Sequence, residues 1–178
     1  MTTTRVLDLA AVTTPAASVA ALAAATAHLE PPYAVVDLGA LATNARSLVG
    51  RAAGKPVRLA TKSVRCRAIS DAVLDLDGYA GILALTLPEA LWLARTCDDV
   101  VVGYPTADVH AIQELASDER LAARVTLMVD STEQVDLIES ALPAGAPPIR
   151  VCLDLDASLR LLRGRLHLGT RQIGRAHV

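Results

Sequence analysis

The sequence contains no phenylalanine, one tryptophan and three tyrosines, so its apolar character comes from alanine, valine and leucine. The three cysteines are odd in number and widely spaced, which argues against a disulfide framework or a zinc motif. The alanine-rich stretch 16–27 is too short for a transmembrane span, and it lacks the basic start and cleavage pattern of a signal peptide. A formal net charge of -2 gives no electrostatic reason to bind nucleic acid or a membrane surface. We therefore expect a reduced, cytoplasmic protein that binds neither.

Lysine is also scarce. Of the 17 basic residues, all but Lys55 and Lys62 are arginine. The abundance of alanine, valine and arginine is typical of a GC-rich genome. Under such a bias, a lysine that remains is more often one whose amine is needed.

The chain is long enough for one domain with a core of its own. Residues 1–32 form an N-terminal extension with one alanine-rich helix, and Pro31 and Pro32 end it. Beyond it, short apolar runs predict strands at 33–38, 57–61, 81–85, 100–103, 125–129 and 149–155. Helical patterns separate them at 40–53, 69–76, 88–94, 107–116 and 132–142. This alternation predicts an α/β fold with a parallel sheet and crossover helices.

Two arrangements of the sheet are compatible with this pattern, an open doubly wound sheet and a (β/α) barrel. A doubly wound sheet that binds nucleotides needs a phosphate-binding turn, and no Gly-x-Gly-x-x-Gly or Gly-x-x-x-x-Gly-Lys follows any predicted strand. A complete (β/α)8 barrel takes about 250 residues and eight strands, so a barrel would stop before closure in this chain.

Lys62 directly follows the predicted strand 57–61. In parallel α/β folds, functional side chains gather at the carboxyl ends of the strands. A partly desolvated lysine there can attack a carbonyl and form a Schiff base. A solvated loop cation or a phosphate anchor would also account for this position.

Several motifs together resemble one family. Pro32 with Tyr33-Ala-Val-Val-Asp-Leu precedes Arg58-Leu-Ala-Thr-Lys62, and Gly81-Ile-Leu-Ala, Val101-Val-Gly-Tyr-Pro and Arg165-Leu-His167-Leu-Gly follow in order. Over roughly 32–171 the chain resembles the alanine racemase N-terminal domain family, the fold type III pyridoxal-phosphate enzymes. An arginine four residues before the lysine is similar to the D-threonine aldolase and D-serine dehydratase branch, which includes proteins described as amino acid deaminase/aldolases. Ala60 and Val64 depart from that branch, which usually has histidine at both positions.

The resemblance implies a partial (β/α)8 TIM-type barrel over residues 33–171, truncated before closure. It implies pyridoxal 5'-phosphate as the cofactor, held by Lys62 as a Schiff base. Arg58 would also contact the cofactor, and Arg165 and His167 compete for the position of the basic group at its phenolic oxygen. The implied reaction is a lyase reaction, an aldolase or dehydratase-deaminase step, on a small-molecule substrate, a D-3-hydroxy amino acid.

The resemblance also implies a homodimeric parent enzyme, with a possible divalent metal whose ligands are not in this chain. An amino-acid racemase and a non-catalytic pyridoxal-phosphate-binding homeostasis protein are the alternatives. Residues 173–178 resemble the translation of a sequencing adapter, so we expect 172–178 to be non-native. We then expect this chain to be an inactive N-terminal fragment of its parent.

Other candidate residues have two interpretations each. Arg58 points either into the barrel mouth or onto the outer surface, and Tyr104 either lines the mouth or packs with its hydroxyl in water. Arg65 and Arg67 are expected to form a solvated face at the start of the next helix. Arg165 and His167 are otherwise surface charges in a glycine-flanked turn.

Overall fold

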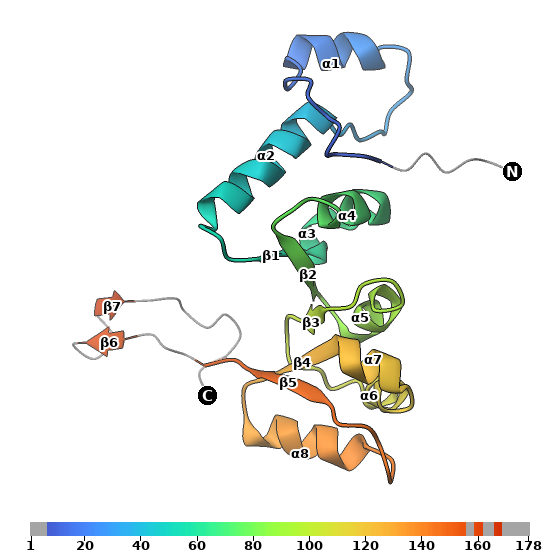
Figure 1. The fold of residues 1–178 in the computed structure, drawn as a ribbon, viewed down its shortest axis with the longest axis vertical. Helices are drawn as coiled ribbons and strands as arrows, with labels where there is room; N and C mark the ends of the chain where they lie inside the picture. Colours follow the sequence, from blue (N-terminus) through green and yellow to red (C-terminus); the bar gives the residue numbers. More distant parts are fainter. Residues whose placement is uncertain (1–6, 156–158, 162–165, 169–178) are drawn as a thin grey trace, which may run out of the picture.

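The computed structural model describes residues 7–155, 159–161 and 166–168 (Figure 1). The helices are α1 (Val19–Thr26), α2 (Leu38–Arg51), α3 (Thr61–Val64), α4 (Arg67–Leu74), α5 (Leu87–Leu93), α6 (Val109–Ala116), α7 (Glu119–Arg124) and α8 (Thr132–Ala141). The strands are β1 (Val57–Ala60), β2 (Tyr79–Ala84), β3 (Val100–Val102), β4 (Val125–Val129), β5 (Arg150–Leu153), β6 (Leu159–Leu161) and β7 (Leu166–Leu168).

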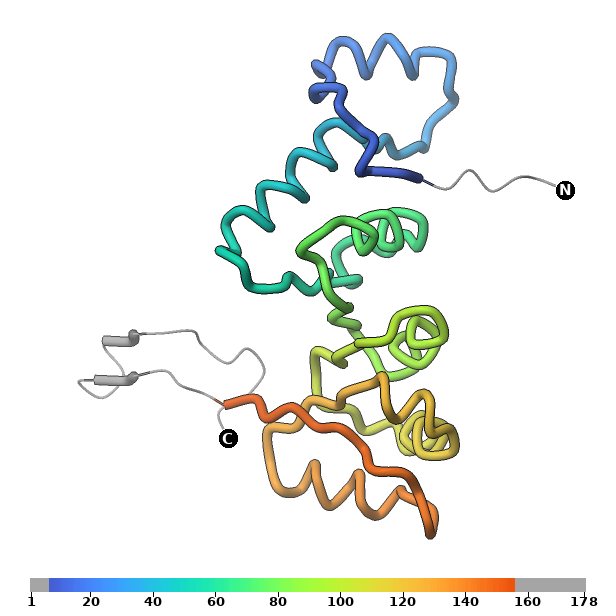
Figure 2. Tube along the Cα trace, viewed as in Figure 1, coloured from blue at the N-terminus to red at the C-terminus, as the bar shows by residue number. Residues whose placement is uncertain are grey.

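Strands β1 to β5 form one parallel sheet in the order β1-β2-β3-β4-β5. Each strand therefore pairs with its neighbour in sequence, and the order never reverses as it does in a doubly wound sheet. Figure 2 shows the successive strand–helix units following one another along the long axis of the molecule. This is the topology of a (β/α) barrel segment, as the sequence predicts. Strands β6 and β7 form a separate antiparallel pair.

The main core lies between the sheet and the helices α5, α6 and α8. Alternate strand residues point to this side, including Ile82, Val100 and Leu127, which are at most 1% exposed. They pack against Leu87 and Ile112, both fully buried. Valine and leucine therefore fill the core in place of the phenylalanine that the sequence lacks.

A second apolar cluster joins the N-terminal segment to α2 and α4. Leu9 is 1% exposed and packs with Ala42, Ala45 and Val73. Arg46 holds the same segment in place, because its guanidinium donates to the backbone carbonyls of residues 9, 10 and 12. The N-terminal extension thus packs on the first helices of the barrel segment.

Five of the six predicted strands are present, with ends that shift by no more than two residues. The strand predicted at 33–38 is wrong. Its apolar side chains Tyr33, Val35 and Val36 are 46–49% exposed, and no strand pairs with them among the described residues. Asp37 explains the change, because its carboxylate accepts from the backbone N–H of Ala40 and makes it the N-cap of α2.

Asp37 also predicts a pH dependence of stability. Backbone N–H groups of Ala40 and then Ala17 hold the pKa of this carboxyl below its ordinary value of 3.8. A lowered folded-state pKa contributes stability above the unfolded pKa that is lost as the pH falls through the folded one. We expect Asp37→Asn to lower the urea midpoint at pH 7, and this deficit to shrink as the pH falls below about 4. An equal deficit at pH 7 and pH 3 would contradict this assignment.

The expected non-native tail 172–178 lies outside the described residues. Within the part of the chain that the structure describes, none of the helices combines the length and the apolar character that crossing a bilayer requires.

Candidate active site

Lys62 lies at the carboxyl edge of the sheet. Strand β1 ends at Ala60, and the single-turn helix α3 begins at Thr61, so the lysine side chain leaves the sheet at the end of its first strand. Thr61 is 3% exposed, whereas Lys62 is exposed. The buried threonine fixes the backbone while the neighbouring amine stays accessible.

The amine of Lys62 contacts a side chain from another strand end. Its Nζ lies 2.8 Å from the hydroxyl of Tyr104 and 5.0 Å from the centre of that ring. Tyr104 follows β3 by two residues, so the contact spans the end of β2. The sequence left open whether Tyr104 lines the mouth. In the structure its hydroxyl points at the lysine.

The backbone around both residues is tied to β2. The hydroxyl of Thr61 donates to the carbonyl of Leu83 at 3.4 Å, and the N–H of Gly103 donates to the carbonyl of Ala84 at 2.8 Å. A Cβ at Gly103 would lie 3.2 Å from that same carbonyl oxygen. A glycine here therefore lets the chain turn closely past β2 and deliver Tyr104.

A cleft of about 320 Å³ opens beside Lys62, between the helices α3, α4 and α5. Leu85, Leu93 and Trp92 supply apolar lining, and Arg65 and Arg67 supply positive charge. Glu89 also lines the cleft, and its carboxylate accepts from the backbone N–H of Leu85 at 2.8 Å. The cleft therefore combines apolar side chains with charges of both signs next to a primary amine.

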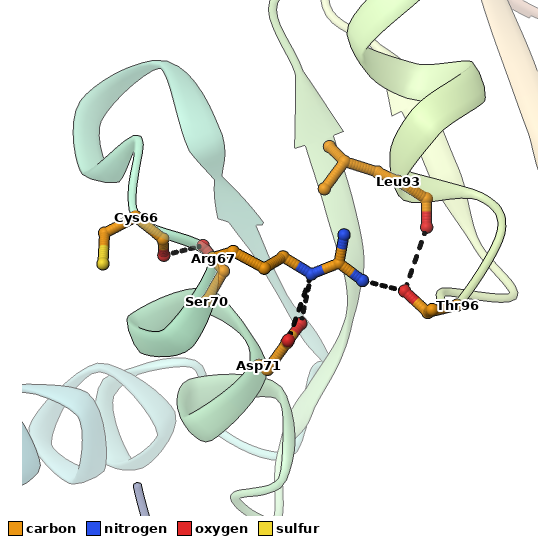
Figure 3. A network of polar contacts seen from close by, with 6 residues as sticks. All are labelled: Cys66, Arg67, Ser70, Asp71, Leu93 and Thr96. Carbon is orange, nitrogen blue, oxygen red and sulfur yellow. Dashed lines mark hydrogen bonds and ion pairs between the residues drawn. The ribbon is translucent and has the colours of Figure 1, made fainter. Parts of the chain in front are cut away.

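Of the two arginines that the sequence placed on a solvated face, Arg65 is exposed as predicted, whereas Arg67 is partly buried and bound. Arg67 is bound on several sides: its guanidinium pairs with Asp71 and donates to Thr96 (Figure 3). It also lies 4.7 Å from the centre of the Trp92 ring. Arg65 is exposed, and its guanidinium donates only to the carbonyl of Lys62 among the contacts found in the described residues. Arg67 therefore joins α4 to α5, and Arg65 is the more available cation.

Arg58 lies on the sheet face opposite the helices, because it alternates with Leu59, which packs against the second apolar cluster. Its guanidinium pairs with Asp99, and Arg150 of β5 approaches the same carboxylate at 3.6 Å. Asp99 directly precedes β3, so this cluster lies toward the amino end of the strands. Arg58 thus lies on the sheet face opposite the helices, where its guanidinium forms an ion pair with Asp99 and has no contact with Lys62 among those found. Its role toward a cofactor stays a prediction.

The other predicted site residues are described only in part. Arg165 lies outside the described residues, and His167 is described by its backbone, which pairs with Arg160 across β6 and β7. Among the described residues, no group of three or more His, Cys, Asp or Glu side chains could hold a metal ion.

A comparison with protein families matches residues 36–167 to the alanine racemase, N-terminal domain. The chain belongs to this family. The match spans 132 of the 178 residues, counted from 36 to 167, and includes all five strands of the parallel sheet. The family domain is a barrel of fold-type III pyridoxal-phosphate-dependent enzymes, and it implies pyridoxal phosphate as the cofactor. A search of curated proteins found no match.

The residues present fit the aldehyde-bearing end of this cofactor. An aldehyde is captured by a primary amine, and the chain has only two lysines. Lys55 precedes β1 at the amino end of the sheet, whereas Lys62 follows β1 at the carboxyl end, where barrel active sites lie. Lys62 is therefore the lysine whose position fits.

Two of the contacts described above were not predicted from the sequence. One is the ion pair of Arg58 with Asp99. The position of Asp99 directly before a buried strand could have indicated a charged partner at that end of the sheet. Tyr104 was noted without its partner, because Lys62 lies 42 residues away and meets it only through the strand register.

Proposed function

We propose that this chain is the N-terminal barrel segment of a pyridoxal-phosphate-dependent lyase of D-3-hydroxy amino acids, in which Lys62 holds the cofactor. The observation that carries the proposal is the exposed Lys62 amine at the carboxyl edge of a barrel sheet from a pyridoxal-phosphate family. The lyase assignment is supported by Arg58, four residues before the lysine, which resembles the aldolase and dehydratase branch. The parent enzyme is proposed to be a cytoplasmic homodimer.

The bound cofactor supplies an electron sink for a bond broken at the substrate Cα. This chain contributes the groups around it. Lys62 provides the amine that holds the cofactor and, once released, can take or give a proton at the substrate. Arg65 supplies positive charge beside that amine and suits a substrate carboxylate. We propose Arg165 or His167 as the basic group near the phenolic oxygen of the cofactor.

The test uses the complete protein that contains this segment, loaded with pyridoxal phosphate. D-Threonine is expected to give glycine and acetaldehyde, or D-serine to give pyruvate and ammonia. Each reaction is run with and without a divalent metal ion, since a metal bound to the 3-hydroxyl would activate it as a Lewis acid. Chromatography identifies the products, and L-threonine and L-serine serve as the matched substrates.

Two other outcomes would overturn the lyase assignment. Appearance of the opposite enantiomer without cleavage would show a racemase. Retention of the cofactor without turnover of any amino acid would show a binding protein. Both outcomes would leave the capture of the cofactor by Lys62 standing, so they separate the reaction from the site.

A further inference from the structure

Tyr104 is the closest polar partner found for the Lys62 amine. The hydroxyl oxygen lies 2.8 Å from Nζ, which is a short distance for a hydrogen bond in which an ammonium donates to a neutral oxygen. The ring centre lies 5.0 Å away, within the range of a cation–π contact. One side chain thus holds the amine in two ways.

This contact crosses the mouth of the barrel segment. Lys62 follows β1 and Tyr104 follows β3, and β2 lies between these strands. Neighbouring strands are about 4.8 Å apart, so the two backbones are separated by roughly 10 Å. The lysine side chain therefore lies over the end of β2. It does not point outward along its own helix.

The backbone on both sides supports the same geometry. Thr61 and Gly103, the residues directly before Lys62 and Tyr104, each donate a hydrogen bond to a carbonyl near the end of β2. The backbone segments that carry Lys62 and Tyr104 are therefore both tied to β2 and have little freedom to move apart.

We propose that Tyr104 is a positioning residue that holds the Lys62 amine over the mouth of the barrel, ready for the aldehyde of the cofactor. This inference rests on the proposed function of Lys62. Before Nζ can form a bond to the aldehyde carbon, the ammonium has to lose a proton and leave the hydroxyl. The exposed hydroxyl can carry that proton: it accepts one from Nζ while its own passes to water, so the tyrosine ends unchanged.

Two amine reagents distinguish positioning from a merely structural role. Formaldehyde with cyanoborohydride methylates any lysine and needs no site, so a held amine reacts more slowly with it than a free one. Pyridoxal phosphate with borohydride labels an amine faster where the amine is presented to the aldehyde. Loss of the Tyr104 hydroxyl should therefore move the two rates in opposite directions.

The experiment uses the full 178-residue chain and measures labelling of Lys62 relative to Lys55 by peptide mass spectrometry. In Tyr104→Phe, we expect formaldehyde labelling of Lys62 to rise about threefold, because the exposed hydrogen bond is lost. We expect its pyridoxal-phosphate labelling to fall about tenfold. Tyr33→Phe is the matched control, since its hydroxyl contacts only Thr26 among the described residues. It should change neither ratio.

Three outcomes of this labelling experiment would overturn the positioning role of Tyr104. Unchanged formaldehyde labelling in Tyr104→Phe would show that the contact does not hold the amine, and would overturn the inference. Preferred pyridoxal-phosphate labelling of Lys62 that survives the substitution would overturn it too, while the proposed function stands. If the unaltered chain shows no preference for Lys62, the proposed function of Lys62 fails and the positioning role fails with it.

Discussion

In the proposed lyase, Lys62→Arg is expected to lower the turnover of D-3-hydroxy amino acids about 1000-fold or more. Arginine keeps the positive charge and much of the length of the side chain. It cannot act as a primary amine toward an aldehyde, because its guanidinium stays protonated in proteins. The measurement is initial velocity at saturating substrate and cofactor, with circular dichroism to confirm folding.

Lys55→Arg is the matched control for this substitution. Lys55 is exposed and lies before β1, at the opposite end of the sheet from Lys62. The same chemical change there should leave turnover unaltered. A Lys62→Arg enzyme with more than about a tenth of the original velocity would contradict a covalent role for this lysine.

Gly81→Ala is expected to destabilise the fold by about 3 kcal/mol. Gly81 has a φ of +83°, in the left-handed region that disfavours a Cβ. A Cβ there would also lie 2.5 Å from the carbonyl oxygen of Asp99. That oxygen accepts the N–H of Ile82 at 2.9 Å, so moving it disturbs the pairing of β2 with β3.

Substitutions at two other glycines separate the cost of the backbone conformation from the cost of the steric clash with Asp99. Gly145 has a φ of +77°, and a Cβ added there would meet no other atom within 4 Å, so Gly145→Ala should show the cost of the backbone conformation alone. Gly50 lies in α2 with open space around it, so Gly50→Ala should stabilise by about 0.5–1 kcal/mol. Urea unfolding measures all three. A Gly81→Ala loss equal to that of Gly145→Ala would show that the Asp99 carbonyl yields to the methyl group.

The apolar runs predicted the parallel sheet well, because buried strands in this fold are short and continuous. The run 125–129 coincides with β4, where alternate residues such as Leu127 are fully buried. Helix α7 escaped prediction, although Asp118 accepts hydrogen bonds from two backbone N–H groups at its start. The antiparallel pairing of β6 with β7 was also not predicted.

The failures have local physical causes. The run 33–38 is as apolar as a strand, but Asp37 at its end starts a helix, and exposed Val35 and Val36 find no neighbouring strand among the described residues. The sequence pattern indicates which residues could be buried. It does not indicate whether a neighbouring strand is close enough to pair with them.

For the candidate site, too, the sequence predicted some features and not others. The position of Lys62 after a strand could be predicted from the local pattern alone. Its hydrogen bond to Tyr104 and the ion pair of Arg58 with Asp99 join residues more than 40 positions apart. Both depend on the register of three strands, which the sequence pattern does not specify.

The most direct test of the central claim is to locate the amine that captures pyridoxal phosphate. The 178-residue chain is incubated with the cofactor, reduced with borohydride, digested and analysed by mass spectrometry. Because the chain has only two lysines, each labelled peptide identifies its residue without ambiguity. We expect the label on Lys62 and little on Lys55 or the N-terminal amine. Equal labelling of both lysines, or a preference for Lys55, would contradict the assignment of Lys62 as the cofactor lysine.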